Sequence, residues 1–286
     1  MSVMKTNFVY KFLYTCLFLI YVSCTISEKN EVILESKSSI KNISYNNFNE
    51  LDVFYYDNFE KLRPVIIFFH GGAWVGGDKS EWTENHSNFF LDKGYINVSA
   101  NYNLNNKNDQ IEDICRVIKW VYDNIEIYGG DKDNIFLFGF SAGAHLVSLI
   151  TTNRNYINKL SLDIKLIRGV CAYDGGPYLG TIDMVAGSYI EYQFKTFFGE
   201  KKSDWEDVLP YYHIKDEKYK PPFLLIAESD DYVRINSNKI FASKLRKHDH
   251  IVTEVYIEEC DHWSIFYEKI FSDNVSNSII DFLNNN

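Results

Sequence analysis

The chain has 286 residues with a hydrophobic content of 46%, which suits one α/β domain with a large core. Its formal net charge of -10 argues against nucleic acid as a partner, because an acidic surface repels a phosphate backbone. Five scattered cysteines do not form a disulfide framework, and no cysteine and histidine spacing predicts a metal site. We therefore expect a globular protein without a metal or a cofactor.

The N-terminus has the features of an export signal. Lys5 and Lys11 precede an uncharged apolar run over residues 12–27, which is shorter than the roughly 20 apolar residues that span a bilayer. Residues 1–24 are therefore predicted to be a signal peptide. The alternative is a lipoprotein leader with Cys24 as the lipidated residue, which would attach the protein to a membrane through its N-terminus alone. Both interpretations predict a secreted or cell-envelope protein.

The rest of the chain divides into a predicted tether at residues 25–48, which are mostly polar, and a folded domain at residues 49–286. In this domain, short apolar runs alternate with segments of helical spacing, which predicts a mostly parallel sheet flanked by helices. An aromatic-rich stretch at about 174–209 falls between two strands and is predicted to be a small cap insertion. The expected strands are 51–56 (at the sheet edge), 64–69, 95–100, 135–138, 167–172, 222–227 and 252–257, and the expected helices are 85–93, 111–127 and 278–283.

The most informative stretch joins an apolar strand to a helix through Gly139-Phe140-Ser141-Ala142-Gly143. This is the G-x-S-x-G pattern in its strand–turn–helix context. A serine on so sharp a turn has a strained backbone, and side chains in place of the two glycines would collide with the strand or the helix. The turn would present the Ser141 hydroxyl at the N-terminal end of a helix, which predicts a nucleophile.

A serine nucleophile needs a base, and His262 is the best candidate among the seven histidines. It follows the last expected strand, and sites in open α/β sheets gather at the carboxyl ends of the strands. The acid that orients this histidine is expected in the loop after the preceding strand, at residues 228–233. Asp230 is predicted, because an acid three residues before a valine matches the hydrolase loop pattern, and Asp231 is the alternative. The order Ser141, Asp230, His262 is that of α/β-hydrolases.

Negative charge on a tetrahedral intermediate needs hydrogen-bond donors, and His70-Gly-Gly-Ala-Trp74 directly follows a buried strand. The predicted donors are the backbone N–H groups of Gly72 and Ala73, joined by that of Ala142 after the nucleophile. Trp74 and Tyr178 are predicted to line a substrate pocket, but aromatic residues at this density are equally often plain core, so both interpretations stay open.

Together these motifs resemble the α/β-hydrolases of the esterase and lipase type, in the branch with an H-G-G motif. The resemblance runs from about residue 52 to the C-terminus, and the segments around Ser141 and His262 are similar to those of arylformamidase-like proteins and small carboxylesterases. It implies the α/β-hydrolase fold and cofactor-free hydrolysis of carboxylic esters or simple amides. Ser141 would be acylated and then freed by water that His262 activates. The glycine usual before the acid loop is replaced by Ala227 or Glu228, which keeps the choice of acid open.

The leading hypothesis is a serine carboxylesterase whose substrates are small acyl or aryl esters. No other partner is expected. An arylformamidase is the second hypothesis, but its pathway is cytosolic and the export signal argues against it. A third is a ligand-binding homologue without activity. Such proteins usually lose the serine or the histidine, whereas Ser141 and His262 are both present.

Overall fold

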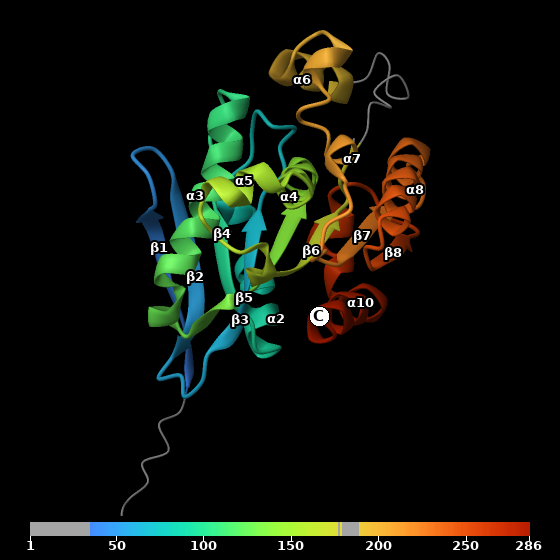
Figure 1. The fold of residues 1–286 in the computed structure, drawn as a ribbon. Coiled ribbons are helices and arrows are strands. Elements are labelled where there is room, and N and C mark those ends of the chain that lie inside the picture. The colour runs from blue at the N-terminus through green and yellow to red at the C-terminus, as the bar shows by residue number, and fades with distance from the viewer. Residues whose placement is uncertain (1–34, 177, 179–188) are drawn as a thin grey trace, which may run out of the picture. The chain divides into compact units, whose positions relative to one another are not determined.

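The computed structural model describes residues 35–176, 178 and 189–286, and Figure 1 shows how their helices surround a single sheet. Within these residues, eight strands pair in the order β1-β2-β4-β3-β5-β6-β7-β8. β1 and β2 are antiparallel to their neighbours, and all pairings from β4 to β8 are parallel. The strands are β1 (Ser36–Ser44), β2 (Glu50–Asp57), β3 (Arg63–Phe69), β4 (Ile96–Ala100), β5 (Gly130–Phe140), β6 (Ile167–Tyr173), β7 (Phe223–Glu228) and β8 (Val252–Ile257).

Helices cover both faces of this sheet, as the alternation of strand side chains requires. In β3, Val65 and Ile67 face a core shared with α3, α4 and α8, whereas Ile66 and Phe68 face a second core shared with α2, α9 and α10. The helices are α2 (Glu84–Asp92), α3 (Lys107–Asn124), α4 (Ala142–Thr152), α5 (Arg154–Lys159), α6 (Tyr189–Phe198), α7 (Pro210–His213), α8 (Tyr232–Lys247), α9 (Ser264–Tyr267) and α10 (Asp273–Asn284). Short 3₁₀ helices are η1 (Lys79–Glu81), η2 (Ile125–Tyr128), η3 (Ile164–Leu166), η5 (Lys202–Asp204) and η6 (Lys269–Phe271).

The sequence-based elements agree well with this architecture, and the prediction of a mostly parallel sheet flanked by helices is confirmed. Each expected strand and helix is found, with ends that differ by a few residues. α3 begins where the Asn106 side chain accepts from the N–H groups of Asn108 and Asp109. Its continuation η2 ends at Gly129, whose φ of 77° is left-handed.

The predicted tether is wrong for residues 36–44, which form β1 and pair with β2. β2 is therefore an inner strand and not the edge. The reason is that β1 contributes backbone hydrogen bonds rather than apolar side chains, since most of its residues are exposed. A strand with so little buried surface has no period-2 hydrophobic pattern to detect.

The predicted leader at residues 1–24 lies outside the described residues, as do residue 177 and residues 179–188 of the predicted cap. The described part of the cap includes α6, from which Phe194 and Phe198 enter the core. Among the described residues, no helix combines the length and apolar character needed to cross a bilayer.

Candidate active site

Ser141 occupies a strained turn between β5 and α4. Its φ of 54° is in the left-handed region, and its backbone N–H donates to the Tyr173 carbonyl oxygen at 2.9 Å. A Cβ on Gly139 would lie 2.3 Å from the Gly143 oxygen, and a Cβ on Gly143 would lie 2.1 Å from the Phe69 oxygen. The two glycines are thus required by close backbone contacts, as the sequence predicted.

His262 follows β8 and meets Ser141 at the carboxyl end of the sheet. Its Nε2 lies 2.9 Å from Ser141 Oγ, in hydrogen-bonding distance. The imidazole stacks on Phe140, with ring centres 4.9 Å apart. The apolar residue beside the nucleophile therefore supports the flat face of the histidine ring and leaves both ring nitrogens free for polar contacts.

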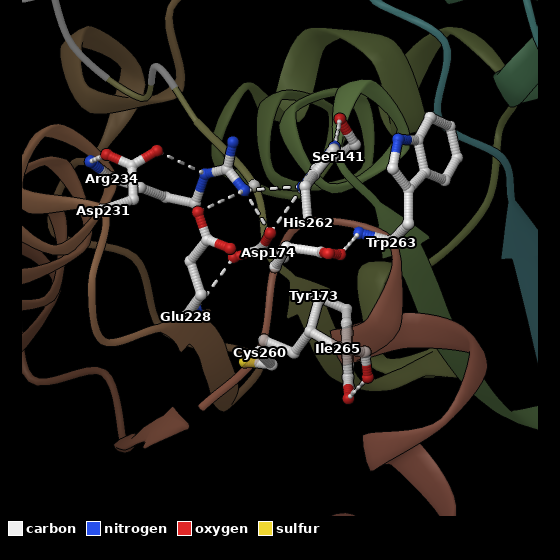
Figure 2. A network of polar contacts seen from close by, with 12 residues as sticks. Ser141, Tyr173, Asp174, Glu228, Asp231, Arg234, Cys260, His262, Trp263 and Ile265 are labelled. Carbon is white, nitrogen blue, oxygen red and sulfur yellow. Dashed lines mark hydrogen bonds and ion pairs between the residues drawn. The ribbon is translucent and has the colours of Figure 1, made fainter. Parts of the chain in front are cut away.

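The carboxylate beside His262 belongs to Asp174. Its Oδ2 lies 2.5 Å from His262 Nδ1, and its Oδ1 accepts from the Glu228 backbone N–H at 3.0 Å. Asp174 directly follows β6, its φ of 48° is left-handed, and its side chain is fully buried. Figure 2 shows Ser141, His262 and Asp174 in sequence, which is the arrangement of a serine–histidine–aspartate triad.

The structure does not bring the predicted acid, Asp230, to His262. Asp230 is exposed and its Oδ1 contacts Ser229 Oγ at 3.3 Å. The alternative, Asp231, accepts from the Arg234 backbone N–H at 2.9 Å and caps the N-terminus of α8. α8 begins directly after this short loop, so the Asp231 carboxylate caps the helix and the Asp230 carboxylate faces solvent. Asp174 takes the position beside the histidine.

Arg234 was not singled out from the sequence, yet it lies at the centre of the charged groups behind the histidine (Figure 2). Its Nη1 contacts Asp174 Oδ2 and lies 2.6 Å from His262 Nδ1. The same atom is 3.9 Å from Glu228 Oε1, and Nε is 3.6 Å from Asp231 Oδ2. Burial, and secondly the charge of Asp174, raises the pKa of Glu228 to about 7.

The H-G-G loop runs beside the nucleophile. A Cβ on Gly71 would lie 3.1 Å from Ser141 Cβ, so the loop backbone passes directly next to the reactive side chain. Three successive residues, Gly72, Ala73 and Trp74, have φ values of 104°, 49° and 65°. The backbone N–H groups of Val75 and Gly76 close this turn, because both donate to the Gly72 carbonyl oxygen.

The predicted oxyanion donors, Gly72, Ala73 and Ala142, have backbone N–H groups without an acceptor in the described part of the chain. Ala142 is the first residue of α4, where a helix leaves its N–H groups unpaired. The donors thus stay unpaired among the described residues, one directly after Ser141 and two in the loop after β3. The neighbouring Gly71 N–H is different, because it donates to Glu81 Oε2 at 3.2 Å.

His70 supports this loop and does not reach the nucleophile. Its ring stacks on Tyr102 at 4.1 Å between ring centres, and Tyr102 donates to the His70 carbonyl oxygen at 2.7 Å. Burial lowers the pKa of His70 to about 4, so the ring is neutral at ordinary pH.

The two aromatic residues predicted for the pocket are both closed to solvent. Trp74 is 1% exposed, donates from Nε1 to His145 Nδ1 at 3.2 Å and packs against α6. Tyr178 is fully buried and stacks on Phe241. The structure therefore places both side chains in the packed core, which is the second of the two interpretations left open by the sequence. No cluster of three or more metal-ligating side chains is found among the described residues.

Fold and site together define an α/β-hydrolase of the esterase and lipase branch. The chain belongs to the BD-FAE family, whose model matches residues 51–245. The resemblance seen in the motifs is thereby confirmed.

Two curated relatives support the assignment to this family. Isoprenylcysteine alpha-carbonyl methylesterase ICME of Arabidopsis thaliana is 26% identical over 215 residues, which are 69% of this chain and 50% of the relative. Esterase LipQ of Mycobacterium tuberculosis is 28% identical over 204 residues, which are 65% of this chain and 46% of the relative. The chain thus spans about half the length of these curated relatives.

Solved structures confirm the fold. A carbohydrate esterase from gut microbiota, in truncated form, gives a TM-score of 0.74 at 18% identity and covers 87% of this chain and 95% of that one. The butyrate-bound esterase Est2 of Thermogutta terrifontis gives a TM-score of 0.66 at 18% identity and covers 89% of this chain and 94% of that one.

Proposed function

We propose that this protein is a serine carboxylesterase that hydrolyses small acyl or aryl esters through an acyl-enzyme on Ser141. The observation that carries the proposal is the continuous contact from Ser141 Oγ through the two nitrogens of His262 to the buried carboxylate of Asp174. Esterase is also the activity named for ICME and LipQ, which are similar to this chain.

In the first half of the reaction, His262 Nε2 accepts the Ser141 hydroxyl proton while Oγ attacks the ester carbonyl carbon. The carbonyl oxygen becomes negatively charged and accepts from the N–H groups of Gly72, Ala73 and Ala142. Collapse of this intermediate breaks the bond to the alcohol oxygen, and the alcohol leaves with the proton held on Nε2. Ser141 then carries the acyl group.

In the second half, His262 Nε2 takes a proton from water, and the resulting hydroxide attacks the acyl carbon. The Ser141–acyl bond breaks, Oγ regains its proton from Nε2 and the carboxylic acid departs. Asp174 accepts from Nδ1–H throughout, which fixes the ring orientation and stabilises the imidazolium in both halves. This chemistry uses side chains and backbone groups alone.

Export remains part of the proposal, on the support of the sequence at residues 1–24. N-terminal sequencing of protein recovered from the medium or envelope tests it. A mature N-terminus near Cys24 is expected, and intact protein retained in the cytoplasm would contradict it.

The decisive experiment measures p-nitrophenol release from acetate and butyrate esters by the wild type and by Ser141→Ala. Turnover that disappears in the folded variant is the expected result. A fluorophosphonate probe provides a second readout, since it should label the wild type on Ser141 without requiring the natural substrate. Equal ester turnover in both proteins, or labelling at another residue, would reject Ser141 as the nucleophile.

A further inference from the structure

Asp174 is a fully buried carboxylate, and a carboxylate buried away from water needs hydrogen-bond donors within the protein. Among the described residues, three hydrogen-bond donors surround it. The Glu228 backbone N–H binds Oδ1, while His262 Nδ1 and Arg234 Nη1 converge on Oδ2. Arg234 is the only permanent cation among the three, since a guanidinium keeps its proton at any physiological pH.

The distances also indicate where the histidine proton lies. An ionised carboxylate oxygen 2.5 Å from Nδ1 is attractive only when Nδ1 carries a proton to donate. Nε2 is then the unprotonated nitrogen, the form able to accept from Ser141 Oγ. A carboxylate fixed at this position therefore selects the reactive tautomer.

We propose, on the basis of the esterase function above, that Arg234 is a positioning residue of the reaction. It binds Asp174 and fixes Oδ2 against His262 Nδ1. The loop after β7 supplies no carboxylate at this point, because Asp231 caps α8 and Asp230 faces solvent. The first turn of α8 instead supplies Arg234, whose guanidinium binds Asp174 at the end of β6.

A competing arrangement of the same atoms predicts the opposite effect. Arg234 Nη1 is 2.6 Å from His262 Nδ1 and could donate to it if the proton were on Nε2. The histidine could not then accept from Ser141, and Arg234 would suppress activity. Removal of the guanidinium therefore distinguishes the two arrangements, because activity falls in the first and rises in the second.

The surrounding acids explain how a cation can lie so close to a histidine that must become positively charged. Glu228 and Asp231 both face the guanidinium, and Asp261 adds negative charge near Glu228 from the segment after β8. Asp174, Asp231 and Asp261 offset the Arg234 charge, and Glu228, with its pKa raised to about 7, adds to them only where it has lost its proton. The imidazolium thus forms in a region that is negative overall.

The test compares Arg234→Met, which removes the donor and the charge, with Arg234→Gln, which keeps a donor, and Arg234→Lys, which keeps the charge. Arg246→Met is the matched control, because Arg246 lies on the same helix, is 48% exposed and pairs with Glu254 away from the triad. For the Met variant we expect kcat to fall about 100-fold with KM nearly unchanged, as for a misplaced catalytic group. Lys should restore part of kcat.

A second readout is independent of turnover. In protein with ¹⁵N-labelled histidine, the Nδ1–H form of His262 should predominate in the wild type and lose population in Arg234→Met. Arg234→Gln and Arg234→Lys provide the same comparison if the Met variant does not fold. A kcat in Arg234→Met equal to or above that of the wild type, or an unchanged tautomer in a folded variant, would overturn the proposal. Failure of the esterase function is distinct, since it appears in the wild type as absent ester turnover, or as turnover that survives Ser141→Ala, and the tautomer measurement tests Arg234 in either case.

Discussion

Asp174 contacts His262 from the end of β6, 2.5 Å from Nδ1, although the two residues are 88 positions apart. β6 lies between the nucleophile strand β5 and β7 in the sheet, so its carboxyl end opens into the same site. An acid at this position is buried under the neighbouring loops, which distinguishes it from the exposed Asp230.

Replacement of Asp174 by Asn should abolish most of the activity. The amide cannot stabilise the imidazolium and favours the wrong histidine tautomer, which in a serine–histidine–aspartate triad costs about 10⁴-fold in kcat. Asp230→Asn is the control and should keep kcat within about twofold of the wild type, because surface changes are usually near neutral. Ester kinetics of both variants decide the acid, and a larger loss in Asp230→Asn would return the role to that residue.

The Gly72→Ala substitution should distort the loop that carries the predicted oxyanion donors. Gly72 has a φ of 104°, and an added Cβ would lie 2.1 Å from the Gly76 carbonyl oxygen, so the backbone must move. Loss of one oxyanion donor typically costs about 100- to 1,000-fold in kcat. Gly76→Ala is a matched control in the same loop, because its Cβ would meet only the Gly72 oxygen at 3.6 Å. Similar kinetics for the two variants would show that the loop geometry is not needed.

Glu228 should make stability depend on pH. Its pKa is raised from 4.5 to about 7, so the folded state holds a proton that the unfolded state has released over this range. Stability from this group should therefore be fully present below about pH 4.5 and decline until about pH 7. Thermal unfolding of Glu228→Gln across this range provides the check. Its midpoint should rise relative to the wild type as pH increases, and two parallel curves would contradict the shifted pKa.

Trp74→Ala should damage stability far more than substrate affinity. The indole is buried between His145 and the α6 residues Phe194 and Phe198. Truncation of a buried tryptophan costs about 3–5 kcal/mol of unfolding free energy. Tyr192→Ala on the same helix is the control, since that side chain is 65% exposed. Denaturant unfolding measures the difference, and a large rise in KM with unchanged stability would instead support a pocket role.

Strand-end reasoning located Ser141 and His262 from the sequence, because Ser141 directly follows an apolar strand, His262 follows the last expected strand, and the carboxyl ends of both strands lie at the same sheet edge. It predicted Asp230 as the acid, whereas the structure brings Asp174 to the histidine. Asp174, Asp230 and Asp231 all follow strands, and the choice depends on which loop turns into a helix at once and which side chain caps it.

Two elements were also hidden by their composition. β1 has almost no buried surface, as described above. α8 buries the polar residues Ser237 and Asn238 along with Phe241, which weakens the helical hydrophobic pattern. Arg234, at the start of this helix, was missed for a different reason. Its importance comes from contacts with the segments after β6 and after β8, and not from a local motif.

β1 also forms one edge of the described sheet, where strands of other molecules could pair with it. An unpaired edge of backbone donors and acceptors invites a strand from another molecule, and exposed lysines and a local irregularity make such pairing unfavourable. β1 carries Lys37 and Lys41, and its register shifts between Ile40 and Ile43, where Asn42 is left-handed. The long apolar strands of the interior thus end, within the described residues, at a charged and uneven border, which disfavours strand pairing between chains through this side of the sheet.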